Sequence, residues 1–156
     1  MPEVPDLPFL IERARHLRAH TLQMIHTARA SHIGSCFSIA EILACLYWHT
    51  LRVDPANPSF PQRDRFILSK GHAAAILYAA LAERGFFPVA ELNDYCRDGS
   101  RLTGHATSGV PGVEVSTGSL GHGLPIGCGL ALAAKSDGES WRTFVLLSDG
   151  ELDEGS

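Results

Sequence analysis

Two apolar runs of strand character, within residues 63–69 and 143–147, each end at a short turn that contains glycine. The first run leads into the turn at 70–72, and the second leads without a charge into the turn at 148–150. Short apolar runs bounded by turn residues are typical of buried strands in a parallel sheet. Because ligands of open parallel sheets bind at the carboxyl ends of the strands, the two turns mark the expected binding crevice.

Helical spacing of apolar residues accompanies these strands. Apolar positions recur at steps of three and four over residues 10–29, which predicts a helix with one apolar stripe. Residues 72–84 are alanine-rich and apolar nearly all round, with Gly85 just past the end, so this helix is expected in the interior. Three further elements are predicted: a short surface helix over 91–97, a strand over 113–116, and a helix from the turn at 117–119 to about residue 135.

Another helix is predicted to begin at Ser38 and to end near residue 50. The tetrapeptide SIAE at 38–41 matches a capping box, in which the serine and glutamate side chains accept hydrogen bonds from backbone N–H groups. Phe37, just before the cap, has the spacing to pack on Ile42 as a hydrophobic staple.

Glycine is frequent between residues 118 and 129. Gly123, Gly127 and Gly129 fall inside the predicted helix, where each costs about 0.5–1 kcal/mol relative to alanine. Close approach of a ligand or of a neighbouring chain would offset that cost, and so would dense packing of the helix on its own sheet. The sequence leaves these alternatives open. For the turn at 118–121 a cofactor is favoured, because free N–H groups there lie at the positive end of a helix.

The charge pattern disfavours several classes of partner. The chain has 13 Lys and Arg against 17 Asp and Glu, a formal net charge of −4, and no basic run, so nucleic acid is not expected. The segment MPEVPDLPFL lacks the basic and apolar stretches of a leader, and nothing later approaches the roughly 20 apolar residues of a membrane span. A cytoplasmic location without membrane contact is therefore expected. Four cysteines at irregular spacings are expected to be reduced and mostly packed thiols.

The eight histidines divide into two sets by their surroundings. Four lie within helical patterns and are expected to be structural. The other four, at junctions beside glycine or serine, are His32, His72, His105 and His122. Imidazoles at such places suit a cleft that binds anions or moves protons near neutral pH. A metal cluster is the rival interpretation, but the spacing of these histidines matches no local ligand motif.

Five motifs follow one another along the chain: SHIGS at 31–35, SKGH at 69–72, TGH at 103–105, PGVEVSTGSLGHG at 111–123, and SDGE at 148–151 followed by EG at 154–155. Together they resemble the thiamine-diphosphate domain of transketolases, in the order that the family has. His122 and Ser148 make the chain most similar to split transketolases, whose N-terminal subunit carries only this domain. The resemblance implies an α/β thiamine-diphosphate-binding fold, a parallel sheet flanked by helices. Residues 1–156 would form the N-terminal part of its diphosphate-binding domain.

The resemblance also implies roles for individual residues. Asp149 resembles the first ligand of Mg²⁺ or another divalent cation, and Gly150 resembles the residue that passes under the diphosphate. The catalytic positions implied around the reactive carbon and the sugar hydroxyls are His32, His72 and His105. The cofactor-binding positions implied are His72, Gly118, Ser119, Leu120, His122, Asp149, Gly150 and Glu154.

The implied activity is that of a transketolase subunit or fragment, which moves a two-carbon ketol unit from a ketose phosphate to an aldose phosphate with thiamine diphosphate. The family's second metal-binding side chain and its pyrimidine domain are not among these residues. We therefore expect a fold that is incomplete at the C-terminus, no activity from the chain alone, and a C-terminal partner subunit that carries the pyrimidine domain, within a homo- or hetero-oligomer. Two alternatives stay open: another thiamine-diphosphate enzyme, related to 1-deoxyxylulose-5-phosphate synthase or a dehydrogenase component, and a non-catalytic assembly module.

Overall fold

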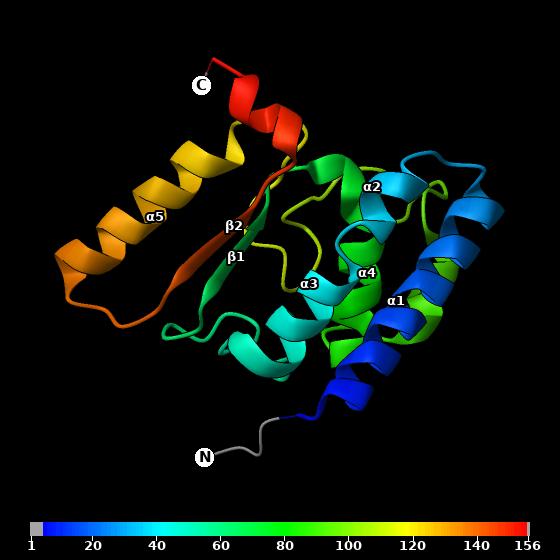
Figure 1. Ribbon diagram of the computed structural model, residues 1–156, viewed down its shortest axis with the longest axis horizontal. Coiled ribbons are helices and arrows are strands. Elements are labelled where there is room, and N and C mark those ends of the chain that lie inside the picture. The colour runs from blue at the N-terminus through cyan, green and yellow to red at the C-terminus, as the bar shows by residue number, and fades with distance from the viewer. Residues whose placement is uncertain (1–4, 156) are drawn as a thin grey trace.

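The computed structural model describes residues 5–155; residues 1–4, which open the segment MPEVPDLPFL, and residue 156 lie outside it. The parallel strands β1 (Arg65–Leu68) and β2 (Thr143–Leu146) lie between α5 (Gly123–Asp137) on one side and α1 (Leu7–Ala28), α3 (Ala40–Cys45) and α4 (Ala74–Arg84) on the other (Figure 1). The remaining helical segments are α2 (Ile33–Phe37), a π-helical turn (Leu46–Thr50) and 3-10 turns at Gly71–Ala73, Val89–Asp94 and Asp149–Asp153. This arrangement confirms the α/β class.

The two strands pair in parallel, with Arg65 opposite Thr143 and Leu68 opposite Leu146. Both strands lie within the apolar runs that predict them, and β2 ends one residue earlier than expected. The Ser69 N–H donates to the Leu146 carbonyl at 2.9 Å and continues the ladder past the end of β1. The turns that follow β1 and β2 therefore leave the sheet at the same edge, as the sequence predicts.

At the opposite edge, a buried carboxylate joins the starts of the two strands. Asp64 accepts hydrogen bonds from the guanidinium groups of Arg52, at 3.0 Å, and Arg142, at 2.6 Å. The backbone N–H groups of Arg52 and Arg142 also donate to it, at 3.0 and 2.8 Å. Burial opposes the ionised form of Asp64, but these hydrogen bonds outweigh it and hold the pKa of the carboxyl well below its usual range.

Asp64→Asn should lower the free energy of unfolding by about 2–4 kcal/mol near neutral pH, because the amide cannot accept all of these hydrogen bonds. The folded-state pKa of Asp64 is depressed, so its contribution is complete above the pKa of an unfolded aspartate and is lost as the pH falls below it. Urea unfolding at about pH 7 and about pH 3 should show the difference between variant and parent shrinking in acid. Asp98→Asn, at an exposed loop position, is the control; an undiminished difference at low pH would contradict the assignment.

Helix α4 forms the centre of the helical layer. Its residues 74–82 are all buried, and Gly85 ends the helix with a φ of 92°, which confirms the predicted interior helix and its glycine stop. Helix α1 packs on α3 and α4 and begins at Leu7, earlier than the apolar stripe indicates, because Asp6 caps it by accepting from the Phe9 N–H at 2.9 Å. Within residues 5–155, no helix combines the length and the apolar character that a membrane crossing requires.

The capping box predicted at Ser38 is wrong. Helix α2 and a turn occupy residues 33–39, and α3 begins at Ala40 without a side-chain cap. The Ser38 hydroxyl instead donates to the Ser35 carbonyl at 2.9 Å and accepts from Lys70 Nζ at 3.0 Å. Glu41 pairs with Arg18 at 2.6 Å, and Ile42, which a staple would bury, is 47% exposed. The helical path still continues through the π-helical turn to residue 50, as predicted.

Three other expectations need correction. Residues 113–116 form no strand; their segment is held by local bonds such as Val113 N–H to the Val110 carbonyl at 3.0 Å. The helix predicted at 91–97 is a 3-10 turn that begins earlier, at Val89–Asp94. The four cysteines are free thiols, as expected, but Cys36 alone is buried, so they are not mostly packed.

Helix α5 rests on the sheet through two of its glycines. A Cβ at Gly127 would overlap Cγ2 of Val145 in β2, and a Cβ at Gly123 would overlap the Ser69 side chain. These glycines therefore pack the helix against its own sheet, and the alternative that they serve a neighbouring chain is wrong for both. Gly129 is exposed, and a Cβ there would meet nothing within 4 Å.

Gly127→Ala and Gly129→Ala should change stability in opposite directions. At Gly127 the added methyl group overpacks Val145 and should cost about 1–3 kcal/mol, whereas at Gly129 the better helix propensity of alanine should stabilise by about 0.5–1 kcal/mol. Chemical denaturation of the two single variants and the parent measures both effects. Equal effects at the two positions would contradict this packing of α5.

Candidate functional site

Three of the four junction histidines gather above the strand ends. The ring centroids of His32 and His72 are 5.2 Å apart, and those of His32 and His105 are 6.0 Å apart. His32 and His105 are exposed and His72 is half-buried, so the cluster is open to a ligand. His122 lies apart as the residue before α5, with Nδ1 3.1 Å from the Leu120 carbonyl oxygen, and among the described residues no ring contact joins it to the other three.

His32 has an unusual backbone. It precedes α2 in the left-handed region, with a φ of 74° and a ψ of 17°, a conformation that costs a residue with a side chain about 1–2 kcal/mol. Such strain is often found at functional positions, where the surrounding structure imposes it. This conformation places the His32 imidazole next to His72 and His105. In the sequence, only the interruption of the helical spacing of apolar residues around position 32 points to it.

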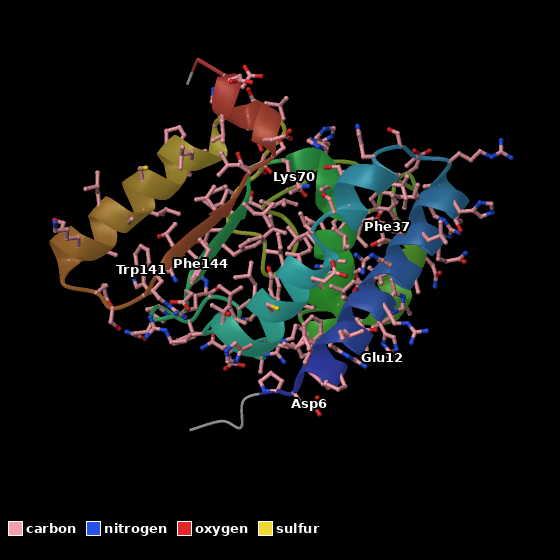
Figure 2. All side chains as sticks on the ribbon, in the orientation of Figure 1. Asp6, Glu12, Phe37, Lys70, Trp141 and Phe144 are labelled. Atoms are coloured by element: carbon pink, nitrogen blue, oxygen red, sulfur yellow. The ribbon has the colours of Figure 1, made fainter. Side chains whose placement is uncertain are left out.

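His72 and Lys70 are held by the α2 segment. His72 Nε2 lies 2.8 Å from Ser35 Oγ, and Lys70 Nζ donates to the Ser35 carbonyl at 2.9 Å. Figure 2 shows Lys70 between the end of β1 and α2. Burial lowers the pKa of His72, with a further contribution from nearby His32, and burial also lowers the pKa of Lys70. His72 is therefore neutral at pH 7 and able to accept or donate a proton.

The segment after residue 116 packs closely on this cluster. Thr117 Oγ1 donates to the Leu68 carbonyl at 2.7 Å, at the end of β1. A Cβ at Gly71 would overlap the Thr117 carbonyl, and a Cβ at Gly118 would lie 3.2 Å from Cδ2 of His105. Glycine is thus required at Gly71 and favoured at Gly118, because backbone and imidazole approach each other closely.

The remaining predicted cofactor residues lie around the end of β2. Asp149 and Gly150 are exposed at the start of the turn Asp149–Asp153, and a Cβ at Gly150 would meet nothing within 4 Å. Within residues 5–155 no hydrogen bond or ion pair engages the Asp149 carboxylate, and no group of three or more His, Cys, Asp or Glu is arranged to hold a metal. A surface depression nearby is lined by Ser119, Leu120, His122, Glu154 and Gly155.

Sequence reasoning missed Glu151. Its side chain is buried, with a relative exposure of 3%, and accepts from Ser69 Oγ at 2.6 Å and from the Gly121 N–H at 3.1 Å. It also accepts from the N–H and hydroxyl of Ser148, at 2.7 and 3.1 Å. Burial alone would raise the pKa of Glu151, but these hydrogen bonds lower it. Ser148 and Glu151 have the spacing of a capping box, and this spacing is the feature of the sequence that could have identified Glu151.

Comparison with known proteins identifies the family. A family model described as transketolase, thiamine diphosphate binding domain, matches residues 11–156. The chain belongs to this family. The transketolase of Pongo abelii is 46% identical over 156 residues, which cover 99% of this chain and 25% of that protein. An apulose-4-phosphate transketolase subunit of Phocaeicola vulgatus is 44% identical over 139 residues, 89% of this chain and 50% of that protein.

Solved transketolase structures share the fold. The structure from Campylobacter jejuni matches with a TM-score of 0.89 at 34% identity, covering 97% of this chain and 25% of that one. The structure from Pichia stipitis in complex with sedoheptulose-7-phosphate matches with a TM-score of 0.90 at 31% identity, covering 94% and 23%. This transketolase-family chain thus spans about a quarter of the Pongo abelii relative and about half of the Phocaeicola vulgatus relative.

The strand-end residues suit a diphosphate ester that carries a divalent cation. Such a cation prefers oxygen ligands, and the Asp149 carboxylate is exposed beside the open space at Gly150. At Gly118 even a Cβ would lie 3.2 Å from Cδ2 of His105, so any side chain there would crowd the His105 ring. The chemistry of the donors therefore fits the cofactor in the family's name.

The backbone strain at His32 predicts an order of stabilities. His32→Gly should be more stable than His32→Ala by about 0.5–1 kcal/mol, because relief of the left-handed strain exceeds the entropic cost of glycine. The same two substitutions at His26, which is exposed in the last turn of α1, should show the reverse order. Thermal unfolding of the four variants measures these stabilities. If the glycine and alanine variants ranked in the same order at both sites, backbone strain at His32 would be contradicted.

Proposed function

We propose that this chain supplies the diphosphate-binding side of a thiamine-diphosphate-dependent transketolase site. The proposed reaction transfers a two-carbon ketol unit from a ketose phosphate to an aldose phosphate. The observation that carries the proposal is the convergence of His32, His72 and His105 beside the glycine at position 118. The similar proteins from Pongo abelii, Phocaeicola vulgatus and Campylobacter jejuni are transketolases, which favours this activity over that of other thiamine-diphosphate enzymes.

Residues at both strand ends would hold the cofactor. Asp149 would bind Mg²⁺ or another divalent cation, and Gly150 would allow the diphosphate to approach the backbone. The other proposed contacts come from His72, Gly118, Ser119, Leu120, His122 and Glu154. When bound, thiamine diphosphate supplies the electron sink that breaking a carbon–carbon bond requires.

The three imidazoles would manage the protons of the sugar hydroxyls. His32 and His105 are exposed, and the His32 ring lies 5.2 Å from the half-buried His72 ring and 6.0 Å from the His105 ring, so a hydroxyl group can reach their ring nitrogens. His72 has a lowered pKa and is fixed through Nε2 to Ser35, so it stays neutral and in one orientation. General acid–base catalysis of this kind contributes about 10²–10⁴-fold to rates.

A second chain or domain would complete the site. Relatives whose names describe a transketolase subunit, such as the 6-deoxy-6-sulfo-D-fructose transketolase subunit from Clostridium, are covered by this chain over about half their length. We propose a partner that carries the pyrimidine domain, within an oligomer. The exposed surface formed by Ser119, Leu120, His122 and Glu154 lies at the edge where such a partner would close over the cofactor.

His105→Ala should lower kcat/KM about hundredfold or more in an active assembly reconstituted with a C-terminal transketolase subunit. The melting temperature should stay nearly unchanged, because Tyr78 and Thr103 hold residue 105 through its carbonyl, at 2.8 and 2.9 Å. His26→Ala, on the exposed face of α1, is the matched control and should retain activity. A large loss of stability with intact turnover per folded molecule would show that His105 is structural, and absence of ketol transfer from the unmodified assembly with cofactor and Mg²⁺ would refute the proposed function.

A further inference from the structure

Glu151 joins three segments that the proposed site needs in fixed positions. Its carboxylate oxygen Oε1 accepts from Ser69 Oγ, which follows β1, and from the Gly121 N–H, which precedes α5. Its other oxygen, Oε2, accepts from the N–H and hydroxyl of Ser148, which follow β2. The side chain is 3% exposed, so water cannot replace these hydrogen bonds without local opening.

The segment 118–120 is tethered at both of its ends. Before it, Thr117 is fixed by its hydroxyl to the Leu68 carbonyl and by its N–H to the Ala106 carbonyl at 3.0 Å. After it, the Gly121 N–H is fixed to Glu151. The first tether reaches the end of β1, and the second reaches the turn that begins with Asp149. The distance between segment 118–120 and that turn thus depends on Glu151.

Only a carboxylate satisfies both backbone donors in this geometry. Gly121 N–H and Ser148 N–H point at different oxygens of Glu151, at 3.1 and 2.7 Å. A backbone N–H group can donate a hydrogen bond but cannot accept one, so both of these positions on Glu151 must be acceptors. A glutamine would place its NH₂ group against one of the two, so one buried N–H would lose its partner.

The Ser69 hydroxyl extends the connection to the helix. It donates to Glu151 at 2.6 Å and accepts from the Gly123 N–H at 3.1 Å, within the first turn of α5. Ser69 is fully buried, and Gly123 has no room for a Cβ against it. Loss of the Ser69 hydroxyl should therefore release Gly123 and leave the two backbone bonds to Glu151 intact.

We propose that Glu151 is a positioning residue that holds segment 118–120 in register with the Asp149–Gly150 turn and thereby sets the affinity for thiamine diphosphate. The identity of the ligand rests on the proposed function, whereas the tether itself does not. Glu151 acts through the backbone of Gly121 and Ser148.

Amide hydrogen exchange of the full chain without cofactor tests the tether. In Glu151→Gln, the amide of Gly121 or Ser148 should exchange about ten- to hundredfold faster, while the Ser69 amide, bonded to the Leu146 carbonyl, keeps its protection. Asp153→Asn removes an exposed charge from the same turn and should change neither amide. Uniform acceleration across the sheet, or unchanged exchange at Gly121 and Ser148, would overturn the proposal.

Ser69→Ala provides an independent test should Glu151→Gln fail to fold. Its Gly123 amide should exchange faster while the Gly121 amide stays protected, because Glu151 still accepts from Gly121. If the Gly121 amide exchanged faster while the Gly123 amide stayed protected, the proposed hydrogen bonds from Gly123 to Ser69 and from Gly121 to Glu151 would be wrong.

Kinetics of the reconstituted assembly test the consequence for the cofactor. Glu151→Gln should raise the concentration of thiamine diphosphate needed for half-maximal activity about ten- to hundredfold and change kcat at saturating cofactor by less than about threefold. A merely structural role would lower the folded fraction without shifting that concentration, and such a result would overturn the proposal. If the unmodified assembly fails to bind the cofactor, the proposed function fails, while the exchange experiment still decides whether Glu151 tethers the segment.

Discussion

The parallel pairing of β1 and β2 is the constraint on which the site depends. The register that sets Leu68 opposite Leu146 brings the turns at 70–72 and 148–150 to one edge of the sheet. At the other edge, Asp64 fixes the starts of both strands through Arg52 and Arg142. A shift of one residue in this register would turn the side chains of one strand to the opposite face and displace the turn at 148–150 relative to the turn at 70–72.

Two buried charged side chains, Lys70 and Glu151, hold the segments around the carboxyl ends of the strands. Lys70 donates hydrogen bonds from its ammonium group to the α2 segment, and Glu151 accepts them from the segments around β2 and α5. Buried charges are tolerated where hydrogen bonds satisfy them. Lys70 donates to a segment distant in sequence, and Glu151 accepts from distant Ser69 and Gly121 as well as from neighbouring Ser148. These hydrogen bonds hold the turns around the strand ends, while His32, His105 and Asp149 stay exposed beside them.

Local sequence pattern predicted the elements whose formation depends on their own residues. The short apolar runs predicted β1 and β2, and the apolar stretch with Gly85 predicted α4. The positions of four histidines beside glycine or serine predicted a cleft lined by imidazoles, and three of them gather, whereas His122 lies apart. Pattern failed where a distant partner decides the outcome. Ser38 accepts a hydrogen bond from Lys70 instead of capping a helix, and Glu41 pairs with Arg18. Glycine is needed at Gly127 because Val145 of β2 leaves no room there for a Cβ.

A crystal structure of the active assembly with thiamine diphosphate and Mg²⁺ tests the central claim most directly. We expect the cation on Asp149, the diphosphate against Gly150 and segment 118–120, and the rings of His32, His72 and His105 around the reactive end of the cofactor. A cofactor bound away from this edge of the sheet, or a cation that leaves Asp149 free, would contradict it.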